Sequence, residues 1–188
     1  MAVRLFRHFN TVMKLYIIDN YRDKYPELKG KELTDRLIED CLEMYSGKRP
    51  EILRTSRGKP YTELYMMDSD TGESKKIHFS VSHSGSVFAC IAGDVPVGID
   101  IQHRRKASAE KIAQRYFTED EKRYVKERGE KGFFELWTRK EAYSKLTGNG
   151  LEDVMAGFDV LQRDDVEFTD LRLEDGAWCS YCVAKQPV

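Results

Sequence analysis

Hydrophobic positions alternate along some segments of the chain and recur at helical spacing along others. Alternation predicts strands at residues 13–18, 77–82, 86–92 and 96–102, and short strands near residues 157–161, 166–173 and 177–184. Helical spacing predicts helices at about residues 31–45, 108–116, 119–128 and 132–147. Strand, helix and hairpin in the first half, then strand, helices and strands in the second, predict an α+β fold of two loosely similar halves.

Turn and capping residues mark the ends of these elements. Gly47 is expected to end the first helix and Gly148 the last one, since glycine readily adopts the left-handed conformation found after helices. Residues 118–121 have the pattern of a capping box, so Glu121 is interpreted first as the partner of the N-cap Thr118.

The two halves are predicted to span residues 13–94 and 95–188, preceded by an N-terminal extension at residues 1–12. The extension lacks a continuous apolar region and a small-residue cleavage site, so we interpret it as neither a secretion signal nor an anchor. No apolar run approaches the ~20 residues that a membrane-spanning helix needs. No sequence repeat relates the halves, so periodicity alone does not establish a duplication.

Composition and charge narrow the functional classes. Hydrophobic residues make up 40% of the 188 residues and charged residues 34%, which is compatible with a packed core. The net charge of −1 argues against general nucleic-acid binding, which usually requires a basic excess. The four cysteines are scattered through a chain large enough to fold without disulfides, so we expect reduced thiols and a cytoplasmic protein.

The strand at residues 96–102 contains the first candidate site residue. Aspartate is unusual within a strand, yet Asp100 has an apolar residue on each side. Alternation places Gly98, Asp100 and Gln102 on one face of the strand. Two interpretations stay open: the polar outer face of an edge strand, or a carboxylate beside the open space that glycine leaves.

The helix at residues 132–147 contains the second candidate. Glu141 and Lys145 are four residues apart, on the same helical stripe as Phe133 and Trp137. The simplest interpretation is a helix ion pair worth ~0.2–0.5 kcal/mol. The aromatic neighbours place Glu141 at the margin of a buried surface, which favours a functional carboxylate if other site residues accompany it.

His83 ends a predicted strand that is rich in serine, including Ser82. Serine hydroxyls, a histidine and the amides of a glycine turn can together bind phosphate oxygens, although a single histidine at a strand end is more often structural. Cys179 and Cys182 have C-x-x-C spacing but lie on an alternating strand, where they face opposite ways, so we expect neither a metal nor a redox role.

Taken in order, these segments resemble the 4′-phosphopantetheinyl transferases, specifically the surfactin-synthetase-activating type. Each segment is common by itself, whereas their order and spacing across about residues 58–151 are specific. The matching segments are Gly58-Lys59-Pro60, Phe79 to Ser84, Val97 to Ile101, Phe117 to Glu121, Trp137 to Ala142 and Lys145 to Leu151.

The resemblance implies two pseudo-symmetric halves, each a small antiparallel sheet packed on helices, with coenzyme A bound between them. The implied reaction transfers 4′-phosphopantetheine from coenzyme A to a serine of an acyl or peptidyl carrier protein and releases 3′,5′-ADP. The implied ligands of a magnesium ion are Asp100 and Glu141, and Lys145 would contact the reacting phosphates. We expect Glu141 also to accept the serine proton. Coenzyme A would be contacted by Lys59, Pro60, Ser82 and His83.

The sequence departs from the family pattern in two places. The second acidic position of the strand motif is Gln102, which would supply a neutral oxygen to the metal instead of a carboxylate. The basic residues that bind the 3′-phosphate upstream of the glycine-lysine-proline turn have no match by motif. Their candidates are Lys31, Arg36, Arg54 and Arg57.

Two other function classes stay open. A metal-dependent pyrophosphohydrolase or nuclease could use the same two carboxylates, and a non-catalytic coenzyme A-binding or carrier-binding module would tolerate Gln102. The expected partners are a carrier protein and coenzyme A, without nucleic acid or membrane, and the expected state is a monomer. The expected carrier-docking segment is residues 108–128, whose basic residues are Lys111, Arg115, Lys122 and Arg123.

Overall fold

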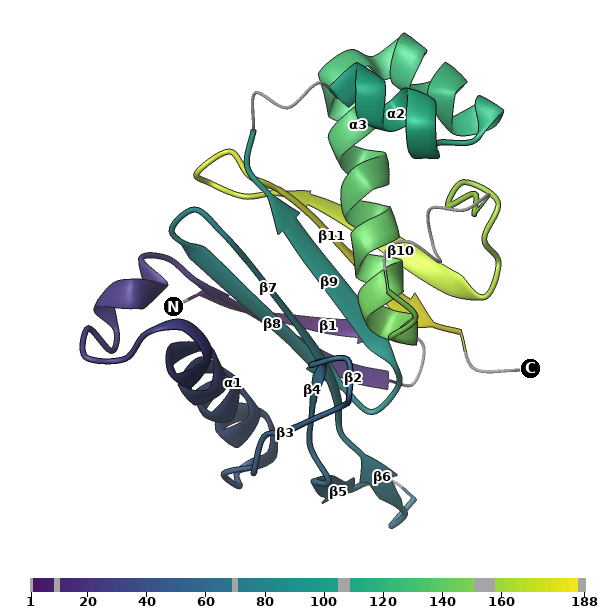
Figure 1. Ribbon diagram of the computed structural model, residues 1–188. Helices are drawn as coiled ribbons and strands as arrows, with labels where there is room; N and C mark the ends of the chain where they lie inside the picture. The colour runs from purple at the N-terminus through teal and green to yellow at the C-terminus, as the bar shows by residue number, and fades with distance from the viewer. Residues whose placement is uncertain (1, 9–10, 69–70, 105–108, 151–157, 186–188) are drawn as a thin grey trace. The chain divides into compact units, whose positions relative to one another are not determined.

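The computed structural model describes residues 2–8, 11–68, 71–104, 109–150 and 158–185 (Figure 1). The chain divides into two compact units, Met1–Val97 and Gly98–Val188. The predicted boundary between residues 94 and 95 lies a few residues before this division.

The first unit is built on a four-stranded antiparallel sheet with strand order β1-β2-β8-β7. The predicted strands at 13–18, 77–82 and 86–92 are confirmed, and residues from the predicted N-terminal extension form β1 beside β2. The strands are β1 (Ala2–His8), β2 (Thr11–Ile18), β7 (His78–Ser84) and β8 (Val87–Gly93).

Helix α1 (Gly30–Ser46) packs on this sheet through the predicted apolar stripe. The stripe includes Leu37 and Cys41, which are fully buried in one cluster with Tyr16 of β2 and Phe88 of β8. Gly47 ends the helix with φ 73°, as predicted. The remaining elements of the unit are short: η1 (Tyr21–Asp23), β3 (Leu53–Arg54), β4 (Pro60–Tyr61), β5 (Tyr65–Met67) and β6 (Ser74–Lys76).

The second unit combines a three-stranded sheet, in the order β10-β11-β9, with two helices. Figure 1 shows the long helix α3 lying across this sheet. None of the helices in the described ranges is long and apolar enough to cross a membrane. The elements are β9 (Val97–Gln102), α2 (Ala109–Tyr116), α3 (Glu119–Thr147), β10 (Val166–Arg172) and β11 (Trp178–Ala184).

Two sequence predictions for this unit need correction. The helices predicted at 119–128 and 132–147 form one element, α3, interrupted by non-helical Gly129 (φ 61°, ψ −141°). The strand predicted near 157–161 is wrong for residues 158–161, while residue 157 lies outside the described part. Side chains of α3 satisfy this backbone, because the Phe158 carbonyl accepts a hydrogen bond from Lys140 and the Val160 amide donates to Glu121.

The two units repeat one topology that the sequence does not reveal. In the first, β2, α1, β7 and β8 come in this order along the chain, with only short elements between them, and the sheet order is β2-β8-β7. In the second, the main helix α3 again follows the first strand, β9, and the sheet order is β9-β11-β10. The predicted α+β class, with a small sheet and helices in each half, is confirmed.

Candidate active site

Strand β9 presents its polar face to helix α3. Ile99 and Ile101 on the opposite face are buried in the core of the unit. Asp100 is 3% exposed, and its Oδ1 accepts a hydrogen bond from Lys145 Nζ of α3 at 2.7 Å. The structure therefore excludes the interpretation of Asp100 as a solvent-facing residue of an edge strand. Gln102, on the same face, is partly buried at the end of the strand.

Gly98 allows the strand to approach the helix this closely. A Cβ atom at this position would overlap the carbonyl oxygen of Ala142 and lie 2.9 Å from the backbone nitrogen of Leu146. Both neighbours are backbone atoms of α3, which cannot rotate away as a side chain can. Because Gly98 and Asp100 lie on the same face of β9, this contact also sets how near the aspartate comes to α3.

Gly98→Ala is therefore expected to lower the free energy of unfolding by about 1–3 kcal/mol, the usual cost of overpacking a core. Urea unfolding would measure this change. The control Ile99→Val removes one methyl group from the other face of β9 and should cost about 0.5–1.5 kcal/mol without separating strand from helix. Stability of Gly98→Ala equal to that of wild type would contradict the close approach.

Glu141 lies on α3 beside this pair. Burial and the negative charge of Asp100 together raise the pKa of Glu141 to about 7, against the opposing positive charge of Lys145. Lys145 makes its ion pair with Asp100, and the described residues contain no Glu141–Lys145 ion pair. The simple helix ion pair is therefore not the arrangement found. Two carboxylates and one ammonium converge at this point of the second unit.

The raised pKa of Glu141 predicts a pH-dependent stability in the absence of metal. Between pH 4.5 and about 7 the folded protein retains a proton that the unfolded chain has released, so the free energy of unfolding falls as pH rises through this window. At ~1.4 kcal/mol per pKa unit, and with partial exposure, the effect of this group is about 1–3 kcal/mol. Glutamine at position 141 cannot titrate, so the stability of Glu141→Gln relative to wild type should be higher at pH 8 than at pH 4.5 by this amount. Urea unfolding of both proteins in the presence of a chelator would measure it. A difference between variant and wild type that is equal at both pH values would contradict the raised pKa of Glu141.

The donor set at this point suits a hard cation. Two carboxylates and the amide oxygen of Gln102 are oxygen donors, and no group of three or more His, Cys, Asp or Glu side chains in the described ranges is arranged to hold a metal. An ion that takes only one or two protein carboxylates and completes its shell with water or phosphate fits such a set.

A second candidate region lies in the first unit. A pocket of about 650 Å³ brings basic residues together with His83, whose side chain is exposed. Ser82, the preceding residue of β7, is buried and faces the other way. Of the glycine-lysine-proline turn, Gly58 contributes to the wall. The pocket is lined by Tyr21, Arg22, Gly30, Lys31, Leu33, Thr34, Arg54, Gly58 and His83.

Neighbouring groups hold the basic residues of this pocket in place. Arg54 donates to the Gly58 carbonyl at 2.9 Å and pairs with Asp35. Arg22, which is not among the predicted phosphate ligands, donates to the Gly85 carbonyl at 2.7 Å and lies over the Tyr21 ring.

Of the other predicted phosphate ligands, Lys31 also lines the pocket, whereas Arg36 pairs with Asp40 elsewhere on the unit. No motif marks Arg22. The local signal is the Asp19-Asn20 turn after β2, where Asn20 adopts a left-handed conformation (φ 48°).

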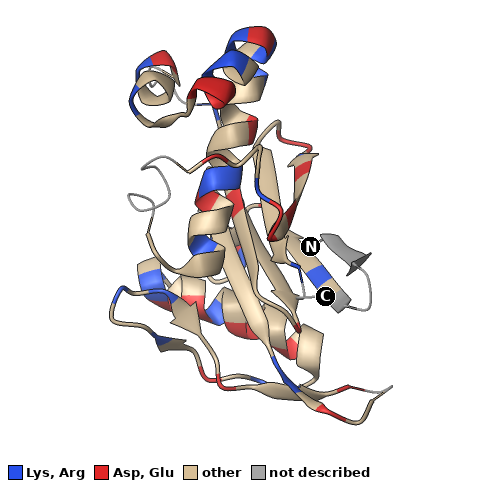
Figure 2. Ribbon diagram, turned by 90° about the vertical axis from the view of Figure 1, so that its right-hand side faces the viewer, with Lys and Arg blue, Asp and Glu red and all other residues tan. Residues whose placement is uncertain are grey.

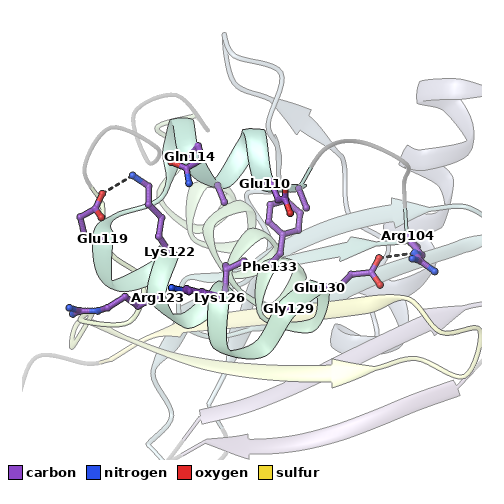
Figure 3. Close-up of a pocket in the computed structure, with 13 residues that line it drawn as sticks. Arg104, Glu110, Gln114, Glu119, Lys122, Arg123, Lys126, Gly129, Glu130 and Phe133 are labelled. Carbon is purple, nitrogen blue, oxygen red and sulfur yellow. Dashed lines mark hydrogen bonds and ion pairs between the residues drawn. The ribbon is translucent and has the colours of Figure 1, made fainter.

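A groove of about 1000 Å³ lies between α2 and the first part of α3 (Figure 3). Ion pairs of 2.7 Å join Lys122 to Glu119 and Arg104 to Glu130 along its rim. Figure 2 shows that basic and acidic residues are interleaved on these helices. The lining residues are Arg104, Ala109, Glu110, Ala113, Gln114, Glu119, Lys122, Arg123, Val125, Lys126, Gly129, Glu130 and Phe133.

Comparison with known proteins identifies relatives of one kind. Residues 96–185 match the family model described as the 4′-phosphopantetheinyl transferase superfamily. The 4′-phosphopantetheinyl transferase psf-1 of Bacillus pumilus is 40% identical over 152 residues, which are 79% of this chain and 60% of the relative. The 4′-phosphopantetheinyl transferase gsp of Aneurinibacillus migulanus is 30% identical over 70% of this chain and 52% of the relative. HetI of Nostoc, a third 4′-phosphopantetheinyl transferase, is 31% identical over 68% of this chain and 55% of its own length.

The aligned part of the chain therefore spans between about half and three fifths of the length of these curated relatives. The matched range 96–185 contains β9 and α3, and with them Asp100, Glu141 and Lys145.

Proposed function

We propose that this chain, which belongs to the 4′-phosphopantetheinyl transferase superfamily through residues 96–185, is a transferase. In the proposed reaction it transfers phosphopantetheine from coenzyme A to a serine of a carrier protein. The observation that carries the proposal is the convergence of Asp100, Glu141 and Lys145 on facing elements of the matched range. An ammonium, together with a cation that a pair of acidic groups can bind, is suited to charge neutralisation in phosphoryl transfer.

In this proposal the serine hydroxyl oxygen bonds to the phosphorus nearest pantetheine. The pyrophosphate bridge to that phosphorus breaks, and 3′,5′-ADP leaves with the bridging oxygen. Glu141 accepts the serine proton. Lys145 neutralises negative charge that develops on the phosphate oxygens.

Magnesium is the proposed metal, held by Asp100 and Glu141 with the amide oxygen of Gln102 as a third donor. Burial is the largest cause of the raised pKa of Glu141, and the negative charge of Asp100 adds to it; this second carboxylate supports a cation at this point. When bound, magnesium would neutralise the charge of the pyrophosphate.

The basic pocket of the first unit is the proposed site for the phosphates of coenzyme A. Arg22, Lys31 and Arg54 supply positive charge around His83, and guanidinium groups bind phosphate in a bidentate manner. The turn formed by Gly58, Lys59 and Pro60 would border the adenine, as the family resemblance implies. Ser82 is buried on the opposite side of β7, so its contact with coenzyme A would have to be through backbone.

The groove between α2 and α3 is the proposed docking site of the carrier protein. Its apolar floor includes Ala113 and Phe133, and its rim carries Lys122, Arg123 and Lys126. Such a surface would receive a helix with apolar and acidic side chains. Lys111 and Arg115 of α2 do not line the groove. We include a cytoplasmic monomer in the proposal, in keeping with four buried free cysteines.

Mass spectrometry of an apo carrier protein after incubation with the chain, coenzyme A and magnesium tests this function. The expected result is the mass gain of one phosphopantetheine on the carrier and an equal amount of 3′,5′-ADP. Hydrolysis of coenzyme A without carrier would instead support a pyrophosphohydrolase. Coenzyme A binding without transfer to any carrier would support the non-catalytic module, and either result would refute the transferase.

A further inference from the structure

Lys145 neutralises a buried carboxylate in the metal-free chain. The side chain of Asp100 is 5% exposed, and the ammonium of Lys145 lies 2.7 Å from its Oδ1. A carboxylate so deeply buried is strongly destabilised unless a positive charge accompanies it. In this structure the protein's own lysine supplies that charge.

The position of Lys145 also allows it to leave. Its side chain is 30% exposed, and four flexible methylene groups carry its charge. It belongs to the last turn of α3, which ends at Thr147 with Gly148 as its C-cap. The carbonyl groups at a helix C-terminus attract positive charge, so an ammonium released from Asp100 has a second favourable location within reach.

A divalent cation and this ammonium are both attracted to the carboxylate of Asp100, whose Oδ1 already accepts a hydrogen bond from the ammonium. Both bind to the carboxylate of Asp100, and positive charges at adjacent positions in a partly buried site repel each other strongly. The two cannot therefore occupy Asp100 together without a large loss of binding energy.

We propose that Lys145 is the resident counterion of Asp100 and that a divalent cation binds only by displacing it. The displaced ammonium then becomes available to phosphate oxygens. This inference rests on the proposed metal site at Asp100 and Glu141. It assigns to the lysine a role before the reaction, in setting the affinity for the metal.

The affinity for a divalent metal, measured without coenzyme A, tests this exchange of the Lys145 ammonium for a metal ion at Asp100. Isothermal titration with Mg²⁺, and electron paramagnetic resonance with Mn²⁺, would compare wild type with Lys145→Met, which keeps an unbranched side chain, one heavy atom shorter, without the charge. Lys145→Met should bind either ion about tenfold or more tightly than wild type, because no ammonium has to be displaced. Lys145→Arg, which keeps the charge, should bind no more tightly than wild type.

Lys131→Met is the matched control for net charge. Lys131 also lies on α3, is 69% exposed and pairs with Glu135 at 3.6 Å, so its loss should leave metal affinity unchanged. Unchanged or weaker metal binding by Lys145→Met would overturn the exchange. An equal gain in Lys131→Met would also overturn it, since net charge would then explain the effect.

Thermal unfolding gives a second measurement that needs no enzymatic activity. Without metal, Lys145→Met should have a lower Tm than wild type because Asp100 has lost its counterion, and Mg²⁺ should raise the Tm of the variant by more than that of wild type. Equal Mg²⁺-induced shifts would contradict the proposal.

Asp100→Asn separates this inference from the proposed function. If Asp100→Asn abolishes Mg²⁺ binding while Lys145→Met leaves the affinity unchanged, only the exchange is refuted. If Asp100→Asn binds Mg²⁺ as wild type does, the metal site itself is wrong and the exchange is refuted with it.

Discussion

Asp100→Asn should reduce the rate of the proposed phosphopantetheine transfer by about 10³-fold, because a ligand of the proposed magnesium ion contributes several kcal/mol to stabilisation of transition-state charge. Asparagine has nearly the same shape as aspartate but no negative charge. The variant therefore loses its attraction for a cation and for Lys145 together, while the packing of β9 on α3 is kept. Initial rates of carrier modification, measured by mass spectrometry over a range of magnesium concentrations, would show the loss.

Asp165→Asn is a suitable control for this experiment. Asp165 lies in the same unit, pairs with Arg163 and has a side chain that is 43% exposed. Its replacement should leave the transfer rate within about twofold of wild type, since exposed ion pairs contribute little. Transfer by Asp100→Asn at more than about a tenth of the wild-type rate would remove Asp100 from the proposed metal site.

Lys140→Met should lower the free energy of unfolding by about 3–5 kcal/mol, the cost of breaking a buried ion pair from one side. Lys140 and Glu121 are both 0% exposed, with 3.0 Å between Nζ and Oε1. Burial lowers the pKa of Lys140, and the charge of Glu121 opposes this effect. Urea unfolding monitored by circular dichroism would measure the loss.

The size of this effect follows from the number of segments that meet at Glu121. Its carboxylate accepts hydrogen bonds from the backbone amides of Thr118 at 3.0 Å and Val160 at 3.0 Å, in addition to the lysine. The pair also joins the two parts of α3 across Gly129. Lys140 precedes Glu141, so loss of the pair should also disturb the candidate active site.

Two further variants would test this interpretation. Lys122→Met breaks an exposed pair with Glu119 on the same helix and should change the free energy of unfolding by less than about 0.5 kcal/mol. The double variant Glu121→Gln with Lys140→Met should be more stable than Lys140→Met alone, because no buried charge is left without its partner. Equal losses from Lys140→Met and Lys122→Met would show that the buried pair contributes no more than a surface pair.

Local sequence signals were sufficient for most elements and for several of their ends. The apolar stripe of α1, the glycine that follows it and the capping box at Thr118 act over a few residues, so their physics is contained in short segments. The polar face of β9 follows in the same way from alternation. The motifs also indicated Asp100 and Glu141 as candidates.

The predictions failed where distant residues compete for the backbone. Residues 158–161 have apolar character, but Glu121 and Lys140 of α3 bind the backbone of this segment. Arg22 joins the basic pocket because the chain turns after β2 and the Tyr21 amide donates to the Ser86 carbonyl at 3.2 Å. Neither contact can be predicted from the residues that lie next to it in the sequence.

The sequence by itself determined most of the longer helices and strands, and which of them carry acidic and basic groups, because periodicity and capping depend on near neighbours. Only the tertiary structure decided how those groups combine. The close approach of Gly98 to the α3 backbone brings Asp100 within reach of Lys145, so the lysine pairs with the strand instead of with Glu141. Which carboxylate Lys145 pairs with depends on the distances between β9 and α3. Packing of the core sets these distances, and they cannot be read from the order of residues.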